Sequence, residues 1–185
     1  MRYAPTKMIF NPEIHRRRSI RMKDYDYSQA GAYFVTICTW NKKCIFGEVE
    51  NAEIRMNECG QVVRNEWLHT ENIRSNVELD AFIVMPNHVH GILIIVDDGR
   101  GVLQYASTKK HGFSSPSQTL GSIIRGLKSS VTKIINQIRN SHGVPVWQRN
   151  YYEHVVRNEP ELNKIREYII NNPLNWKTDE NYRAD

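Results

Sequence analysis

The 185-residue sequence has few cysteines and no long apolar run, and each shortage excludes a class of protein. The three cysteines, Cys38, Cys44 and Cys59, are odd in number and form no Cys-x-x-Cys pair. This usage argues against a disulfide framework or a zinc ribbon and indicates reduced thiols. No stretch approaches the roughly 20 apolar residues of a membrane span, and the N-terminus lacks the apolar core of a secretory signal. We therefore expect a cytoplasmic protein with no membrane partner.

Acidic residues are missing from one long segment. Residues 99–152 contain no Asp or Glu, whereas residues 47–98 contain ten acids and three bases. Bases that we expect to contact a polyanion lie in the acid-free segment and in the N-terminal arm: Arg16, Arg17, Arg18, Arg21, Arg125, Lys128, Lys133 and Arg149. Such cations bind nucleic acid because they release counterions from the phosphates. A solvated helix face and a charged tail would also explain the pattern.

The hydrophobic pattern predicts an α+β domain. Runs rich in β-branched and aromatic residues predict strands at 32–40, 77–85 and 89–96, a short one at 48–55 and a last one within 144–156. Helical spacing and capping residues predict helices at 57–70, 120–138 and 158–172. The order strand, helix, strand, strand, helix, strand is that of ferredoxin-like and RRM-like folds. We expect an antiparallel sheet with helices on one face, the other face free for ligands, and an additional C-terminal helix.

The chain divides into a basic arm at 1–31, one domain at 32–176 and a loose tail at 177–185. Within the domain, residues 97–117 form a loop rich in Gly, Ser and Lys. Loops of this length in compact domains tend to be functional or disordered, so we expect this one to be mobile. On the helix that follows, Arg125 and Lys133 are expected to face solvent, opposite the apolar stripe.

A His-x-His pair begins one of the central strands. Side chains alternate along a strand, so His88 and His90 share one face, about 7 Å apart, while Val89 points into the core. Two imidazoles on one face can bind a single metal ion. Partly exposed histidines of a sheet would show the same spacing, so the pair alone does not decide between these readings.

The C-terminal helix carries Tyr168 and, four residues later, Asn172, which places both on one helical face. Tyr168 lies at the edge of the apolar stripe, where a core tyrosine also places its hydroxyl. The preceding segment, residues 147–157, mixes aromatic side chains with cations. That mixture is typical of surfaces that stack single-stranded bases, although an amphipathic strand explains it nearly as well.

Taken together, the motifs are more specific than any one of them. MPNHVHGILI, a basic amphipathic helix and VWQRNYYEHVVRNEPELNKIREYIINNP follow one another along the chain. This order resembles the single-tyrosine HUH transposases, especially the REP-associated tyrosine transposases and their relatives, from about Tyr33 to Trp176. The resemblance implies an RRM-like catalytic domain at 32–176. It also implies a metal-dependent transposase or endonuclease that cleaves and rejoins single-stranded DNA through a 5′-phosphotyrosine.

The resemblance also implies a role for each motif residue. His88 and His90 match the family's metal-binding histidines, Asn172 its polar third ligand and Tyr168 its nucleophile. The implied cofactor is Mg²⁺ or Mn²⁺, and imidazole ligands favour Mn²⁺ in affinity. The implied partner is single-stranded DNA containing hairpins, bound by a monomer or a homodimer.

Several alternatives stay open at this point. A non-enzymatic binder of single-stranded nucleic acid could use the same RRM-like sheet, with the histidines as core or stacking residues. Tyr151 and Tyr152 are rival nucleophiles because they lie in an aromatic, basic segment. His154 and Glu153 lie within sequence reach of a general-base role. A histidine-triad hydrolase is disfavoured because Ile92 occupies the position of its third histidine.

Overall fold

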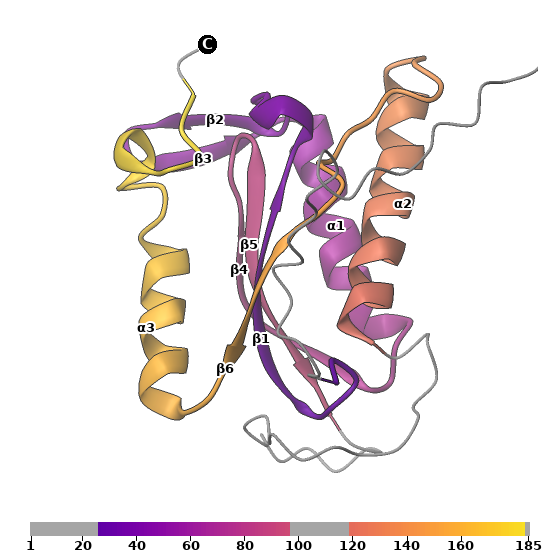
Figure 1. The fold of residues 1–185 in the computed structure, drawn as a ribbon. Helices are drawn as coiled ribbons and strands as arrows, with labels where there is room; N and C mark the ends of the chain where they lie inside the picture. The colour runs from indigo at the N-terminus through magenta and orange to yellow at the C-terminus, as the bar shows by residue number, and fades with distance from the viewer. Residues whose placement is uncertain (1–25, 97–118, 184–185) are drawn as a thin grey trace, which may run out of the picture.

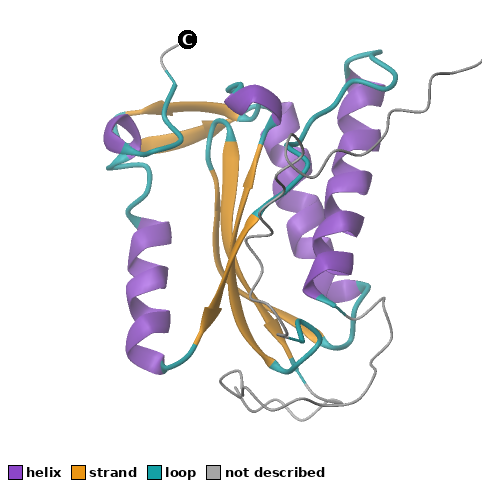
Figure 2. Cartoon of the chain, in the orientation of Figure 1, coloured by secondary structure: helices purple, strands orange, loops and turns teal. Residues whose placement is uncertain are grey.

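The computed structural model describes residues 26–96 and 119–183. The four arginines of the arm and the loop at 97–117 lie outside these residues. Figures 1 and 2 show a central sheet with α1 and α2 on one side and α3 on the other. None of the helices in the described ranges combines the length and apolar character required to cross a membrane.

The central sheet has four strands: β1 (Gly31–Cys38), β4 (Val77–Val84), β5 (His88–Ile95) and β6 (Tyr152–Val156). They are ordered β4-β5-β1-β6, and every neighbouring pair is antiparallel. β5 is buried at all of its positions, as its unbroken apolar run predicts for a covered central strand. The α+β class and the predicted order of elements are therefore confirmed.

A separate hairpin lies between β1 and α1. Its strands are β2 (Gly47–Glu50) and β3 (Glu53–Met56), where the sequence predicted one short strand. The two turn residues, Asn51 and Ala52, have positive φ angles of 51° and 64°. Positive φ at both central residues is the conformation of tight two-residue hairpin turns. Alanine rarely adopts it, which is why the turn was not recognisable from the sequence.

Helix α1 (Glu58–Asn72) begins at a cap that the sequence allows. The side chain of Asn57 accepts a hydrogen bond from the backbone N–H of Gly60 at 3.1 Å. A glycine stands near the start of this helix, at position 60, and the structure shows why it is needed. A Cβ at this position would lie 2.1 Å from the carbonyl oxygen of Phe46.

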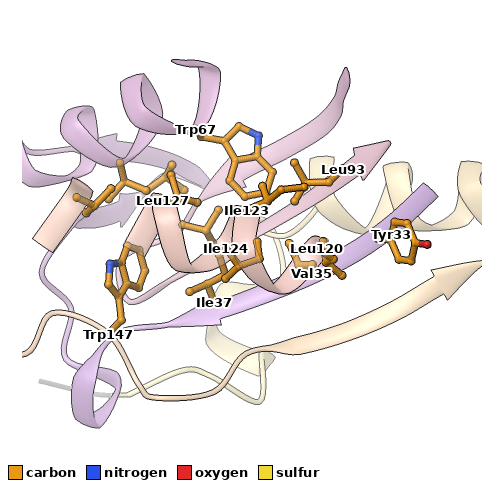
Figure 3. Packing of buried hydrophobic residues seen from close by; sticks show 14 of the residues in the cluster. Tyr33, Val35, Ile37, Trp67, Leu93, Leu120, Ile123, Ile124, Leu127 and Trp147 are labelled. Atoms are coloured by element: carbon orange, nitrogen blue, oxygen red, sulfur yellow. The ribbon is translucent and has the colours of Figure 1, made fainter. Parts of the chain in front are cut away.

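Helix α2 (Leu120–Ile138) packs beside α1 on the same side of the sheet (Figure 1). Its apolar stripe meets side chains of β1 and β5 in the main core, which Figure 3 shows from close by. Trp67 of α1 enters this core directly over β5, because Gly91 leaves room for it. A Cβ on Gly91 would lie 2.2 Å from the Trp67 ring.

Helix α3 (Glu159–Ile170) crosses the opposite side of the sheet. It starts as predicted: the Asn158 side chain accepts from the N–H of Glu161 at 2.9 Å, and Pro160 stands in the first turn. Leu162 and Ile169 bury their side chains in a second apolar cluster on the sheet. The expectation that this face is free for ligands is therefore wrong in part, because α3 covers some of it.

Candidate active site

His88 and His90 lie side by side on β5, on the side of the sheet that α3 covers. Their ring centroids are 4.4 Å apart. The two residues are 0% and 2% exposed, and His90 lies directly behind the half-exposed Tyr168. The prediction that the pair shares one face is confirmed.

Neighbouring polar groups fix the orientation of the His88 ring. The Asn87 amide nitrogen donates to the carbonyls of Lys42 and Asn181, at 2.9 and 2.8 Å. The Asn87 Oδ1 is thereby turned towards His88 and accepts a hydrogen bond from its Nδ1 at 2.8 Å. His88 therefore carries its proton on Nδ1 and presents the lone pair of Nε2 to the interior of the site.

The second ring is held in a similar way. The Thr36 hydroxyl, on β1 directly opposite His90, lies 2.8 Å from His90 Nδ1. His90 Nε2 then faces the Tyr168 hydroxyl at 3.2 Å. Such partners on the far nitrogen orient a metal-binding imidazole and fix its tautomer.

Burial keeps both imidazoles neutral. It lowers the pKa of His88 to about 3, and the positive charge of Lys42 acts in the same direction, while the Asn172 side chain opposes it. Burial also holds the pKa of His90 well below its usual range, with a further lowering by His88 and an opposing effect of Asp179. Neutral imidazole is the form that binds a metal ion.

Tyr168 reaches this pair from α3. The helix is fixed to the sheet by a bidentate ion pair in which Arg166 Nε and Nη2 contact the two Asp80 oxygens at 2.9 and 2.6 Å. The Tyr168 side chain is 44% exposed, and its hydroxyl points at His90 Nε2, with the Asp179 carboxylate at 3.5 Å. Burial, and then the negative charges of Asp179 and Glu180, raise the pKa of Tyr168 to about 12.

Asn172 and Asp179 complete the set of side chains around the histidines. Asn172 is 1% exposed, and its amide nitrogen donates to Asp179 Oδ2 at 3.2 Å. Within the described part of the chain, two buried atoms lack a hydrogen-bond partner here: His88 Nε2 and Asn172 Oδ1. The ligand atoms of His88, His90 and Asp179 all lie within 4.8 Å of one another.

Asp179 belongs to the segment at 177–183, which is part of the loose tail that the sequence predicted at 177–185. That prediction is wrong, because the segment packs against the end of the sheet. The Trp176 ring lies 5.9 Å from the His88 ring, and Tyr182 contacts Trp176 edge-on at 5.3 Å. The carbonyl of Asn181 is held by Asn87, as described above. The segment therefore closes the site from one end.

The predicted DNA-binding bases of the described region lie in different settings. Arg125 and Lys133 are exposed on α2, as predicted, and Arg149 is exposed in the segment before β6. Lys128 differs, because its ammonium donates to the carbonyls of Gln148 and Asn150 at 2.8 and 2.9 Å. In this structure, Lys128 holds the segment before β6 in place instead of facing solvent.

The other residues that the sequence singled out lie around the edge strand β6. Tyr151 packs on the main core, under Lys128, whereas Tyr152 lies on the face of the histidines. Glu153 is buried on the opposite face, across from Val35. His154 lies on the site's face, but its Nε2 contacts Glu161 Oε1 at 2.8 Å.

Sequence reasoning missed Thr36, Asn87 and Asp179. Asn87 immediately precedes the His-x-His pair, so its position was the one available signal. Thr36 and Asp179 are brought to the histidines only by strand register and by the turn that follows α3.

Comparison with known proteins supports the fold and identifies one relative. No family model matches the chain. The structure is similar to that of a REP-associated tyrosine transposase bound to a REP hairpin, with a TM-score of 0.54 and 17% sequence identity over 83% of this chain and 72% of that one. A protein of Haemophilus influenzae described only as uncharacterized is 42% identical over 177 residues, covering 94% of this chain and 97% of that protein. Because this identity extends over nearly the whole of both sequences, the chain belongs to the family of the Haemophilus influenzae protein.

Proposed function

We propose that the protein is a metal-dependent transposase or endonuclease that cleaves and rejoins single-stranded DNA through a 5′-phosphotyrosine at Tyr168. The observation that carries the proposal is the convergence of a tyrosine hydroxyl and two neutral histidines, with Tyr168 Oη 3.2 Å from His90 Nε2. The similarity in fold to a tyrosine transposase bound to a REP hairpin supports the same class of substrate.

The side chains present fit a divalent cation. His88 Nε2 and Asn172 Oδ1 are buried, without a hydrogen-bond partner in the described residues, and next to a carboxylate. Buried polar atoms in native proteins nearly always have a partner, so the two atoms indicate an absent ligand. His88, His90, Asn172 and Asp179 would hold Mg²⁺ or Mn²⁺, and this mixture of nitrogen and oxygen donors suits Mn²⁺. When bound, the cation would offset the charge of the phosphate oxygens and orient the phosphate.

The residues of the chain would perform the covalent step. Tyr168 Oη forms a bond to phosphorus while the bond to the 3′ oxygen breaks, which leaves a 5′-phosphotyrosine and a free 3′-hydroxyl. Because the phenol has a pKa of about 12, its proton must be accepted nearby. Asp179 Oδ2 lies 3.5 Å from the hydroxyl and can accept the proton, whereas His90 Nε2, at 3.2 Å, would be occupied as a ligand of the cation. Rejoining reverses the step, and the covalent link preserves the energy of the broken bond.

The test is formation of a covalent protein–DNA adduct. Wild-type protein is incubated with a single-stranded DNA hairpin and Mn²⁺, and the products are resolved by denaturing gel and mass spectrometry. We expect an adduct on Tyr168 that is absent with EDTA and absent in Tyr168→Phe, which loses only the hydroxyl. Tyr151→Phe is the matched control and should keep the adduct.

Two outcomes would contradict the proposal. A phosphotyrosine adduct that persists in Tyr168→Phe would place the nucleophile elsewhere. Tight DNA binding by the wild-type protein without an adduct under any metal condition would support a non-enzymatic binder of single-stranded nucleic acid.

A further inference from the structure

Tyr152 lies on the same face of the sheet as the histidines, at its open edge. β6 pairs with β1 alone, so it forms one edge of the four-stranded sheet. Tyr152 is opposite Thr36 on β1, and Thr36 is opposite His90 on β5. The three residues therefore form a row across neighbouring strands, with Tyr152 two strands, or about 10 Å, from His90.

Phe34 connects Tyr152 to the candidate active site through direct ring contacts. The buried Phe34 ring stacks on His90 at 5.5 Å and meets Tyr168 edge-on at 6.1 Å. It also meets Tyr152 edge-on at 6.2 Å. These contacts form an aromatic row (His90, Tyr168, Phe34 and Tyr152) that leads from the nucleophile to the edge of the sheet.

The outer end of the row is open to solvent. Tyr152 is 51% exposed, which is unusual for a large aromatic ring in a strand whose neighbours are mostly buried. Its inner edge is held by Phe34, so the ring is already ordered before a ligand arrives. A rigid, half-exposed aromatic side chain can add contact area at a small entropic cost.

Exposed cations lie close in sequence to both tyrosines of the row. Lys164 is exposed and lies one helical turn before Tyr168, and Arg149 is exposed three residues before Tyr152. Of the acids on α3, Glu161 is engaged by His154 and by the backbone N–H of Arg157, whereas Glu167 is exposed next to Tyr168. A strand of DNA whose phosphate reaches Tyr168 would therefore pass one exposed cation on α3, Lys164.

We infer that Tyr152 is a stacking platform for a nucleobase of single-stranded DNA, in the nucleotide next to the phosphate that Tyr168 attacks. The inference rests on the proposed function, because it takes Tyr168 as the point of attack. Stacking on an aromatic face accepts any base, so the platform positions the strand without selecting its sequence. Tyr152 thereby acts in binding and leaves the covalent step to Tyr168.

The experiment measures stacking directly, in a protein that cannot cleave. A Tyr168→Phe background is titrated with a hairpin oligonucleotide in which the single-stranded bases are replaced, one at a time, by 2-aminopurine. We expect the fluorescence of one position to be quenched on binding. Adding Tyr152→Leu should remove the quenching and weaken binding by about tenfold, whereas Tyr152→Trp should retain both.

Controls separate stacking from a structural role. Leu68→Ala, an exposed change on α1 at the other side of the sheet, should leave quenching and affinity unchanged. Thermal unfolding of each variant shows whether the fold is retained. Tyr152→Trp keeps an aromatic ring at this position, so it tests whether any aromatic side chain is sufficient for stacking.

The outcomes distinguish the inference from the proposed function. Quenching and affinity that are the same in Tyr152→Leu as in the parent would overturn the platform, even if adducts on Tyr168 form normally. Equal losses in Tyr152→Leu and Tyr152→Trp would also overturn it, because an aromatic ring would then not be sufficient. Quenching that depends on Tyr152 in a protein that never forms an adduct would support the platform and contradict the proposed function.

Discussion

The two faces of the central sheet are built from the same strands but differ in what they bury. The face under α1 and α2 buries aliphatic and aromatic side chains in one large cluster (Figure 3). The face under α3 has a smaller apolar cluster at one end and buried polar side chains at the other, including Thr36, His88, His90 and Asn172.

This difference assigns most of the stability of the fold to the face under α1 and α2, and the candidate active site to the face under α3. Apolar burial is the main favourable contribution to folding, and the larger cluster supplies most of it. Buried histidines and amides cost free energy unless they are paired, so they are tolerated where a rigid scaffold holds them. The face under α1 and α2 is that scaffold, and four independent changes test the division.

The largest expected effect is on the free energy of unfolding, from a change on the buried side of α1. Trp67→Ala removes a fully buried indole from the main core and should lower the free energy of unfolding by about 3–5 kcal/mol. Urea denaturation measures the change. Leu68→Ala, at the exposed neighbouring position, should shift it by less than about 0.5 kcal/mol. A loss below about 1 kcal/mol for Trp67→Ala would contradict the view that the face under α1 and α2 supplies most of the stability.

The next effect is on metal affinity, from a change on the other face. Thr36→Val preserves the shape of the side chain but removes the hydroxyl that holds His90 Nδ1. Loss of such a partner typically weakens metal binding by about 10–100-fold, and isothermal titration with Mn²⁺ measures it. Thr70→Val is the matched control, because this buried threonine bonds a carbonyl within α1. Equal affinities for the two variants would show that Thr36 does not position His90.

The third effect is a dependence of stability on pH. The pKa of His88 is lowered by burial to about 3, from an ordinary value of 6.5. Between these two pH values His88 is protonated in the unfolded chain but neutral in the folded, metal-free protein. Its contribution to the free energy of unfolding is therefore fully present above pH 6.5 and is lost as the pH decreases towards 3. His88 alone should cost about 2 kcal/mol by pH 5. Denaturation in EDTA at pH 7.5 and pH 5 should show a smaller decrease for His88→Gln than for wild type.

The smallest effect tests whether DNA also contacts the outside of the scaffold. Replacing both Arg125 and Lys133 by Gln removes two exposed cations of α2, which lies across the sheet from Tyr168. If these bases contact phosphates of single-stranded DNA, affinity should fall for all sequences, and the slope of log affinity against log salt should decrease by about 1.4. Arg64→Gln, on the exposed side of α1, should leave the slope unchanged. An unaltered slope in the double variant would restrict the DNA path to the face of α3.

The sequence predicted those parts of the molecule that depend on short-range patterns. The strands on either side of residues 86–87 follow from apolar runs, and the cap of α3 follows from Asn158. The shared orientation of His88 and His90 follows from strand alternation alone. Each of these features is determined within a few residues of chain.

The features that were missed depend on contacts between distant parts of the chain. Asp179 is in a polar stretch that looks like a tail, and it reaches the histidines only because the chain turns back after α3. Lys128 was expected to be a free cation, but three backbone carbonyls from residues 148–150 surround its ammonium. Neither the turn nor the carbonyls have a signature in the local composition.

The strand order has a consequence for how the protein folds. β1 lies inside the sheet, and Phe34 pairs with Ile92 on one side and with His154 on the other. The first strand of the sheet therefore acquires its second neighbour only after more than a hundred further residues have been synthesised. Pairings this distant in sequence slow folding, because a long loop must close before the contacts form. On the ribosome, β1 remains an unpaired edge until β5 appears and α3, with Tyr168, docks on a sheet that is already complete.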